Sequence, residues 1–286
     1  MAANPRDIRR RIKSIKNTAQ ITKAMQMVAA AKMRKAQLAA LAGHPYAEML
    51  NKVLVDLKER SDSSLHPLLD VRPVEKELVL VIATDKGLCG ALNTNLLREV
   101  SQFDAAKTTF VTSGRKGVQY LNRTKRTILA DFPLHEKVTI AETKAVSKFL
   151  IEKFVSGEFD KISVLYTRFV STLTIPPTIR TILPIDPSQF KKTDDTPKEA
   201  LTDYIYEPSA TAVLNDLLPQ YVHFQIYQMM LDSRASEQSS RMVAMKNATD
   251  NAKQLIKDLT LEYNKVRQAA ITTQLLEIAT AQMAIG

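Results

Sequence analysis

Residues 236–281 read SEQSSRMVAMKNATDNAKQLIKDLTLEYNKVRQAAITTQLLEIATA and contain neither glycine nor proline. Both residue types are in fact absent from the whole segment between Pro219 and Gly286. Glycine and proline interrupt helices, because glycine lacks conformational restriction and proline lacks the amide donor and clashes with the preceding turn. The end of the chain is therefore predicted to form one long helix.

The beginning of the chain shows the same pattern, because the segment between Pro5 and Gly43 also lacks both residue types. Asn4 can cap a helix there, Pro5 suits the first helical position, and Asp7 lies in the first turn, where the helix dipole favours an acid. A second long helix is predicted from about Pro5.

Both terminal segments carry the alternating four- and three-residue spacing that is typical of coiled coils. At the N-terminus the spacing is followed by Ile8, Ile12, Ile15, Ala19, Thr22, Gln26, Ala29, Met33, Ala36 and Ala40. At the C-terminus it is followed by Ala248, Ala252, Leu255, Leu259, Glu262, Val266, Ala269, Thr273 and Leu276. Because one chain carries both tracks, the simplest arrangement pairs the two ends as an antiparallel coiled coil.

Helix length then limits the architecture. The C-terminal segment would be about 100 Å long as a helix, whereas a compact globule of this chain length has a radius of gyration of about 19 Å. The helix is therefore expected to project as a rod and to need further partners along its apolar seam. In the alternative, the segment breaks into several bundle helices, with Ser239, Ser240 and Asn247 as weak break signals.

The middle of the chain changes to an α/β pattern. The apolar run LVLVIAT at residues 78–84 is followed by the turn DKGLCGALNTN and then by a helical segment, which is the order of an α/β unit. Further strands are predicted at residues 108–113, 127–130, 161–166 and 172–183, and a covering helix at residues 140–156. Pro176 and Pro177 suit a sheet edge or a bulge rather than the centre of a sheet. A polar connector is predicted from residue 191 to residue 207.

Composition excludes several classes of protein. The chain has 286 residues, of which 45% are hydrophobic and 24% charged, as expected of a globular protein. No apolar run approaches the length of a membrane span, and no signal-peptide core follows Met1. A single cysteine cannot form an internal disulfide, and four scattered histidines do not suggest a metal site. No cofactor is expected.

Positive charge is concentrated at the N-terminus. Residues 1–42 contain ten lysines and arginines and one acid, a balance of +9 within a total of +10. The partner of this segment is expected to be acidic: a nucleic acid, an anionic membrane surface or an acidic protein patch. A basic coiled coil that binds nucleic acid is one hypothesis, although no aromatic residue precedes Tyr46 to stack on a base.

The turn after the first strand contains Asp85, Gly87, Cys89 and Gly90. Its Gly-x-x-Gly spacing falls short of both the dinucleotide-binding and the Walker phosphate-loop patterns. The two glycines are interpreted as allowing a tight turn and close helix packing. An α/β enzyme with Cys89 as a catalytic thiol remains an alternative, but no His or acid near Cys89 in the sequence forms an obvious relay.

Three blocks resemble the family of gamma subunits of the rotary F-type ATP synthase. They are IRRRIKSIKNTAQITKAMQMVAAAKMRKAQ at residues 8–37, TDKGLCGALNTN at residues 84–95, and the C-terminal stretch quoted above. They occur in the expected order, and the similarity extends over essentially the whole chain. The resemblance implies a fold in the α/β class: an antiparallel coiled coil of long terminal helices plus a central Rossmann-like α/β domain. The implied division is an N-terminal shaft helix at 1–60, a foot domain at 75–190, a connector at 191–208 and a C-terminal shaft helix at 209–286.

The resemblance also implies a function: a central rotor shaft that transmits torque between the membrane c ring and the ring of three alpha and three beta subunits. Ion flow would thereby be coupled to ATP synthesis or hydrolysis. Nucleotide chemistry would take place on beta, so this chain would be a non-catalytic subunit. The implied partners are the alpha, beta and epsilon subunits and the c ring, with no nucleic acid. The complex would be peripheral to the cytoplasmic face of a bacterial inner membrane.

Site residues follow from the matched motifs. Met25, in TKAMQMVAAAK, matches a shaft position near an acidic segment of beta, and Lys23, Lys32, Arg34 and Lys35 would complement that acid. Polar contacts with a beta loop are implied for Arg241, Gln268 and Thr272. An apical bearing, whose apolar contacts have no preferred angular register, is implied for Ile271, Leu275, Leu276, Ile278, Ala279, Met283 and Ile285.

Overall fold

The computed structural model describes residues 4–60, 66–133, 138–186, 206–207 and 209–285. The chain forms two compact units, one made of residues 1–30 and 241–286 and the other of residues 31–240. We call the first the helix pair and the second the α/β unit. None of the helices in the described ranges combines the length and the apolar composition that crossing a bilayer requires.

Two helices run through both units: α1 (Pro5–Ala42) and α6 (Ala210–Ile285). Asn4 caps α1 as predicted, since its side-chain oxygen accepts a hydrogen bond from the backbone N–H of Arg6 at 3.0 Å. The helix ends before Gly43, where an added Cβ would lie 2.6 Å from the side chain of Gln228. A separate helix, α2, follows at His44–Arg60.

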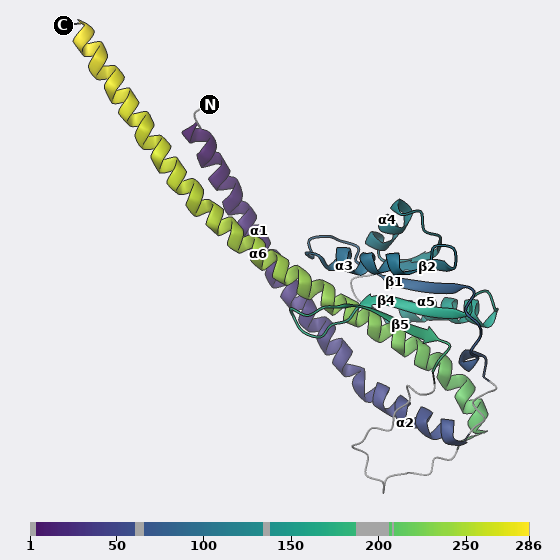
Figure 1. Cartoon of the computed structure of the whole chain (residues 1–286). Helices are drawn as coiled ribbons and strands as arrows, with labels where there is room; N and C mark the ends of the chain where they lie inside the picture. Colours follow the sequence, from purple (N-terminus) through teal and green to yellow (C-terminus); the bar gives the residue numbers. More distant parts are fainter. Residues whose placement is uncertain (1–3, 61–65, 134–137, 187–205, 208, 286) are drawn as a thin grey trace. The chain divides into compact units, whose positions relative to one another are not determined.

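Within the helix pair, α1 and α6 run antiparallel, so that α1 begins at the end of the pair toward which α6 runs (Figure 1). Between these two helices, the hydroxyls of Thr22 and Thr249 lie 2.7 Å apart. The N-terminal seam is confirmed, because all ten of its predicted residues are buried or half-buried.

The C-terminal seam is only partly as predicted. Ala252, Leu259 and Val266 are buried or half-buried, but Leu255 and Glu262 are exposed. The seam instead passes through Met245, Thr249, Ala252, Ile256, Leu259, Tyr263 and Val266. The prediction was wrong at Leu255 and Glu262, where the seam runs one residue later, through Ile256 and Tyr263. The later predicted members Ala269, Thr273 and Leu276 are exposed.

The α/β unit is built on a five-stranded sheet in the order β3-β2-β1-β4-β5. Its strands are β1 (Glu77–Ile82), β2 (Thr108–Ser113), β3 (Ile128–Phe132), β4 (Lys161–Thr167) and β5 (Pro177–Leu183). The first four are parallel, and β5 pairs antiparallel with β4. All five predicted strands are present, but the last begins at Pro177 rather than at residue 172. It lies at the sheet edge, which is one of the two positions that its prolines suited.

Helices cover both faces of this sheet, which explains why β1 is an unbroken apolar run. Val79 and Val81 pack in one core with α3 (Leu92–Arg98), the 3-10 helix η3 (Glu99–Gln102) and α4 (Arg115–Arg123). Leu78, Leu80 and Ile82 pack in the opposite core with α2, the 3-10 helix η2 (Pro67–Leu69), α5 (Ile140–Val155) and the beginning of α6.

The first part of α6 packs on this second face through residues spaced by about one turn: Leu214, Leu218, Val222, Ile226, Met229 and Met230. The helix continues through Pro219. The polar connector predicted at residues 191–208 lies almost entirely outside the described residues. The structure describes only residues 206 and 207 of it.

Candidate functional site

The order of the strands indicates where a ligand site is expected, at the carboxyl ends of β1 and β4. The chain reverses its direction of sheet growth between the neighbouring parallel strands β1 and β4. In open α/β sheets, ligands bind outside the carboxyl ends of the strands at this switch point. Here the edge is formed by residues 84–91 after β1 and by residues 167–176 at the end of β4, which together we call the socket.

The socket holds the chain's own C-terminal helix. The hydroxyl of Ser236 donates to the backbone oxygen of Thr167 at 3.1 Å, and the hydroxyl of Ser239 donates to that of Thr172 at 3.1 Å. The hydroxyl of Ser240 donates to the backbone oxygen of Cys89 at 2.7 Å. Thus α6 lies where this class of sheet would bind a small molecule.

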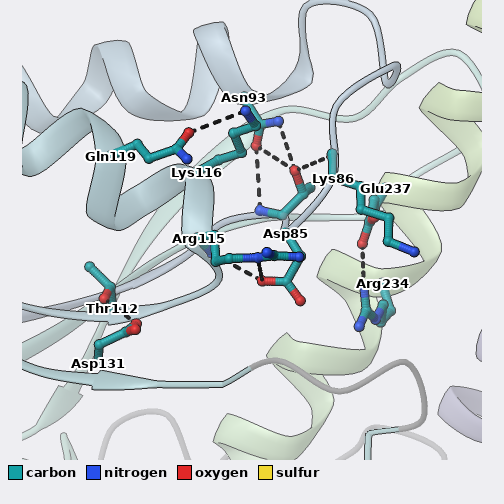
Figure 2. A network of polar contacts seen from close by, with 11 residues as sticks. Asp85, Lys86, Asn93, Thr112, Arg115, Lys116, Gln119, Asp131, Arg234 and Glu237 are labelled. Carbon is teal, nitrogen blue, oxygen red and sulfur yellow. Dashed lines mark hydrogen bonds and ion pairs between the residues drawn. The ribbon is translucent and has the colours of Figure 1, made fainter.

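Residues 233–239 of α6 are buried without interruption. A helix with no exposed face is enclosed by its surroundings. Two of the enclosed residues are charged: Arg234 and Glu237 form an ion pair at 2.5 Å, with side chains 10% and 4% exposed (Figure 2). Enclosed charges need such a partner, because burial of an isolated charge is costly.

The turn after β1 is held in shape by side chains of the TDKGLCGALNTN block. The Thr84 hydroxyl donates to the backbone oxygen of Lys86 at 2.8 Å. The side-chain amide of Asn93 donates to the Thr84 hydroxyl at 2.8 Å and to the sulfur of Cys89 at 3.3 Å. Asp85 accepts from the backbone N–H of Arg115 at 3.0 Å (Figure 2). These contacts hold in place the backbone carbonyl of Cys89, which accepts the hydrogen bond from the Ser240 hydroxyl.

The two glycines of this turn differ. Gly90 has a φ of 58°, which favours glycine, and Leu88 adopts a similar φ of 63° despite its side chain. By contrast, a Cβ added to Gly87 would meet nothing within 4 Å, so close packing does not explain Gly87. Cys89 is buried.

The residues expected to contact beta are distributed over both units. Lys23, Met25, Arg241, Gln268 and Thr272 belong to the helix pair, where Lys23, Gln268 and Thr272 are exposed and Met25 and Arg241 half-buried. Lys32, Arg34 and Lys35 belong to the α/β unit. Lys32 is half-buried, and Arg34 and Lys35 are exposed.

The expected bearing residues lie on the last turns of α6 and are exposed. Ile271, Leu275, Leu276, Ile278 and Met283 have exposed fractions between 47% and 84%. Ala279 is also exposed, and the side chain of Ile285 lies outside the described part of the chain. Large apolar side chains at such exposure indicate a surface that a partner covers.

A cavity of about 640 Å³ in the α/β unit was not predicted. Its lining includes Tyr46, Lys144, His223, Phe224 and Tyr227. Burial, and secondarily the charge of Lys144, holds the pKa of His223 below its ordinary value. His223 also contacts the hydroxyl of Ser147 through Nδ1.

Sequence reasoning missed the role of the three serines and treated Ser239 and Ser240 only as weak signals of a helix break. The helix in fact passes through them unbroken. The available signal was the cluster of three serines within five residues of an otherwise helical segment. Serine is a modest helix former that competes for backbone groups, so such a cluster in a helix suggests polar contacts to other segments.

Comparisons with known proteins agree with this architecture. A family model described as ATP synthase matches residues 4–285. The ATP synthase gamma chain of Methylacidiphilum infernorum (isolate V4) is 50% identical over 292 residues, covering 99% of this chain and 100% of the relative.

Two solved structures share the fold. A chain in the Euglena gracilis mitochondrial ATP synthase, in a structure of OSCP/F1/c-ring in rotational state 3, has a TM-score of 0.69 and 22% identity and covers 98% of this chain and 94% of its own. A chain in the rotor of that synthase, in rotational state 1, has a TM-score of 0.63 and 20% identity. It covers 93% of this chain and 98% of its own length.

Proposed function

Because the chain belongs to the ATP synthase gamma chain family, we propose that it is the central rotor shaft of an F-type ATP synthase. The observation that carries this proposal is the 50% identity to a curated gamma chain over 99% of the sequence. The fold supports it, since two long terminal helices run antiparallel in the helix pair and the five strands of the sheet lie between them in the sequence.

The shaft transmits torque between the membrane c ring and the ring of alpha and beta subunits, and it couples ion translocation to ATP synthesis or hydrolysis. It contributes no catalytic residue, and nucleotide chemistry takes place on beta. Rotation alters nucleotide affinity only if the shaft contacts the three beta subunits unequally, because a contact that is equal in all states shifts no equilibrium.

We assign contact with beta to Met25 and to the polar residues named above with it. Lys23, Lys32, Arg34 and Lys35 complement an acidic segment, and Arg241, Gln268 and Thr272 make polar contacts with a loop. The apical bearing is formed by the exposed residues Ile271, Leu275, Leu276, Ile278, Ala279 and Met283, together with Ile285. Their exposure supports this assignment.

The proposal includes the division of the chain into an N-terminal shaft segment at 1–60, in which α1 and α2 are separate helices, a foot domain at 75–190, a connector at 191–208 and a shaft helix at 209–286. The partners are the alpha, beta and epsilon subunits and the c ring. The complex is peripheral to the membrane and, in a bacterium, lies on the cytoplasmic face of the inner membrane.

Reconstitution tests this function. Purified alpha and beta subunits are mixed with the full chain, and both co-purification and ATP hydrolysis are measured. The chain should assemble with them and increase ATP hydrolysis. ATP hydrolysis that is indifferent to the chain would refute the proposal, and steeply salt-dependent binding of DNA in its place would support the nucleic-acid hypothesis.

A further inference from the structure

Three hydroxyls of α6 are directed at three separate backbone carbonyls of the socket. Ser236 and Ser240 are four residues apart and Ser239 lies between them, so all three share one face of the helix. Their acceptors are Thr167 at the end of β4, Thr172 in the following loop and Cys89 in the turn after β1. The carbonyls that hold the helix therefore lie at the ends of two adjacent parallel strands, β1 and β4, or in the loops that follow them.

These contacts fix the helix in two directions. A turn of α6 by one residue position is a rotation of about 100°, which would move all three hydroxyls away from their acceptors. A shift along the helix axis would separate them as well, because hydrogen bonds weaken steeply with distance and angle. Apolar contacts alone would resist such movements less, since they are non-directional.

Enclosure makes the three contacts more important. Ser236 and Ser239 are fully buried, so a displaced hydroxyl would leave an unpaired polar group away from water. The contact between Arg234 and Glu237 joins two residues of α6, so this ion pair by itself moves with the helix and does not fix it to the socket.

We propose that Ser236, Ser239 and Ser240 are positioning residues that lock α6 to the α/β unit against rotation and axial slip. Torque applied to the α/β unit then reaches the helix that continues beyond the socket. This inference rests on the proposed rotor function and adds to it the place where torque enters the shaft helix.

Ser233 provides a matched control. It lies on the same helix, one turn before Ser236, and is buried. Within the described part of the chain its hydroxyl has no hydrogen-bond partner. Replacement of Ser233 by alanine therefore removes a buried serine hydroxyl from this segment without removing a contact to the socket.

The test compares complete ATP synthases that carry the wild-type chain, the triple variant S236A/S239A/S240A or the control S233A. The readout is the number of protons pumped per ATP hydrolysed in membrane vesicles. Each neutral hydrogen bond shifts the equilibrium between the native and the displaced position of α6 by about fivefold. Loss of three such bonds therefore favours the displaced position by about 100-fold. The ratio should fall several-fold in the triple variant and stay at the wild-type value in S233A.

An unchanged ratio in the triple variant would overturn the proposal, and so would an equal fall in S233A. If the triple variant does not assemble, S240A is compared with S240T, which keeps the hydroxyl. A lower ratio in S240A than in S240T supports the lock, and equal ratios in the two overturn it. Failure of the rotor function itself would be recognised separately, by a wild-type chain that does not assemble with alpha and beta.

Discussion

At the scale of single residues, backbone geometry decides which glycines are required. Gly114, just before α4, has a φ of 106°, and a Cβ there would lie 2.3 Å from the backbone oxygen of Ala83. Gly117, within α4, has only an ordinary contact at 3.4 Å from the Cβ of Ala83. Three residues apart, the two glycines should respond very differently to the same substitution.

Gly114→Ala should destabilise the chain by about 2 kcal/mol or more, because the new methyl group meets backbone and the φ is unfavourable for alanine. Gly117→Ala is the control, and it should be neutral or stabilising by up to about 1 kcal/mol, since alanine is the better helix former. Urea unfolding followed by circular dichroism measures both. Equal effects of the two substitutions would contradict this account.

His223 should make stability depend on pH. Its pKa is lowered in the folded chain, chiefly by burial, so the unfolded chain binds the proton more tightly. The stabilisation is complete above the unfolded pKa of about 6.5 and is lost as pH falls from there toward the folded pKa. Unfolding free energies at several pH values between 7.5 and 5 (about the titration range of histidine) should decline less in His223→Asn. Identical pH profiles would exclude His223 as the cause.

At the scale of elements, a polar pair marks the seam of the helix pair. The hydroxyl of Thr249 lies 2.8 Å from the backbone oxygen of Met245 and 2.7 Å from the hydroxyl of Thr22. Each hydroxyl has one proton, so the shortest consistent arrangement has Thr249 donating to Met245 and Thr22 donating to Thr249. A buried polar pair of this kind specifies the register of two helices.

A double-mutant cycle with Thr22→Val and Thr249→Val tests this arrangement. Valine keeps the shape but removes the hydroxyl, so each single variant should lose about 1 kcal/mol of stability. The double variant should lose less than the sum, by about 0.5 kcal/mol or more. Urea unfolding of the four proteins gives the coupling energy, and strict additivity would show that the two hydroxyls act independently.

At the scale of the whole molecule, stability and function are expected to depend on different residues. The α/β unit has cores on both faces of its sheet, whereas the final turns of α6 carry exposed apolar side chains. Those turns contribute little burial within this chain, which agrees with their proposed role as a bearing in the assembled synthase.

Removal of residues 280–286 should therefore leave the unfolding free energy of the isolated chain within about 0.5 kcal/mol of the wild type. In the reconstituted complex, the same truncation should modestly weaken assembly or the coupling of pumping to hydrolysis. Thermal unfolding and the pumping ratio are measured on the same preparations. A truncated chain that assembles and couples like the wild type would remove these residues from the bearing.

The absence of glycine and proline by itself determined α1 and the part of α6 after Pro219, and apolar runs with turn signals determined the strands. Such patterns are local, because helix breaking and strand alternation depend on a few neighbouring residues. Tertiary structure alone decided that the seam of α6 runs through Thr249 and Tyr263, and that Ser236, Ser239 and Ser240 bind the socket. Those roles depend on acceptors far away in the chain, such as Cys89 and Thr167, and residue type does not reveal which distant carbonyl a hydroxyl will meet.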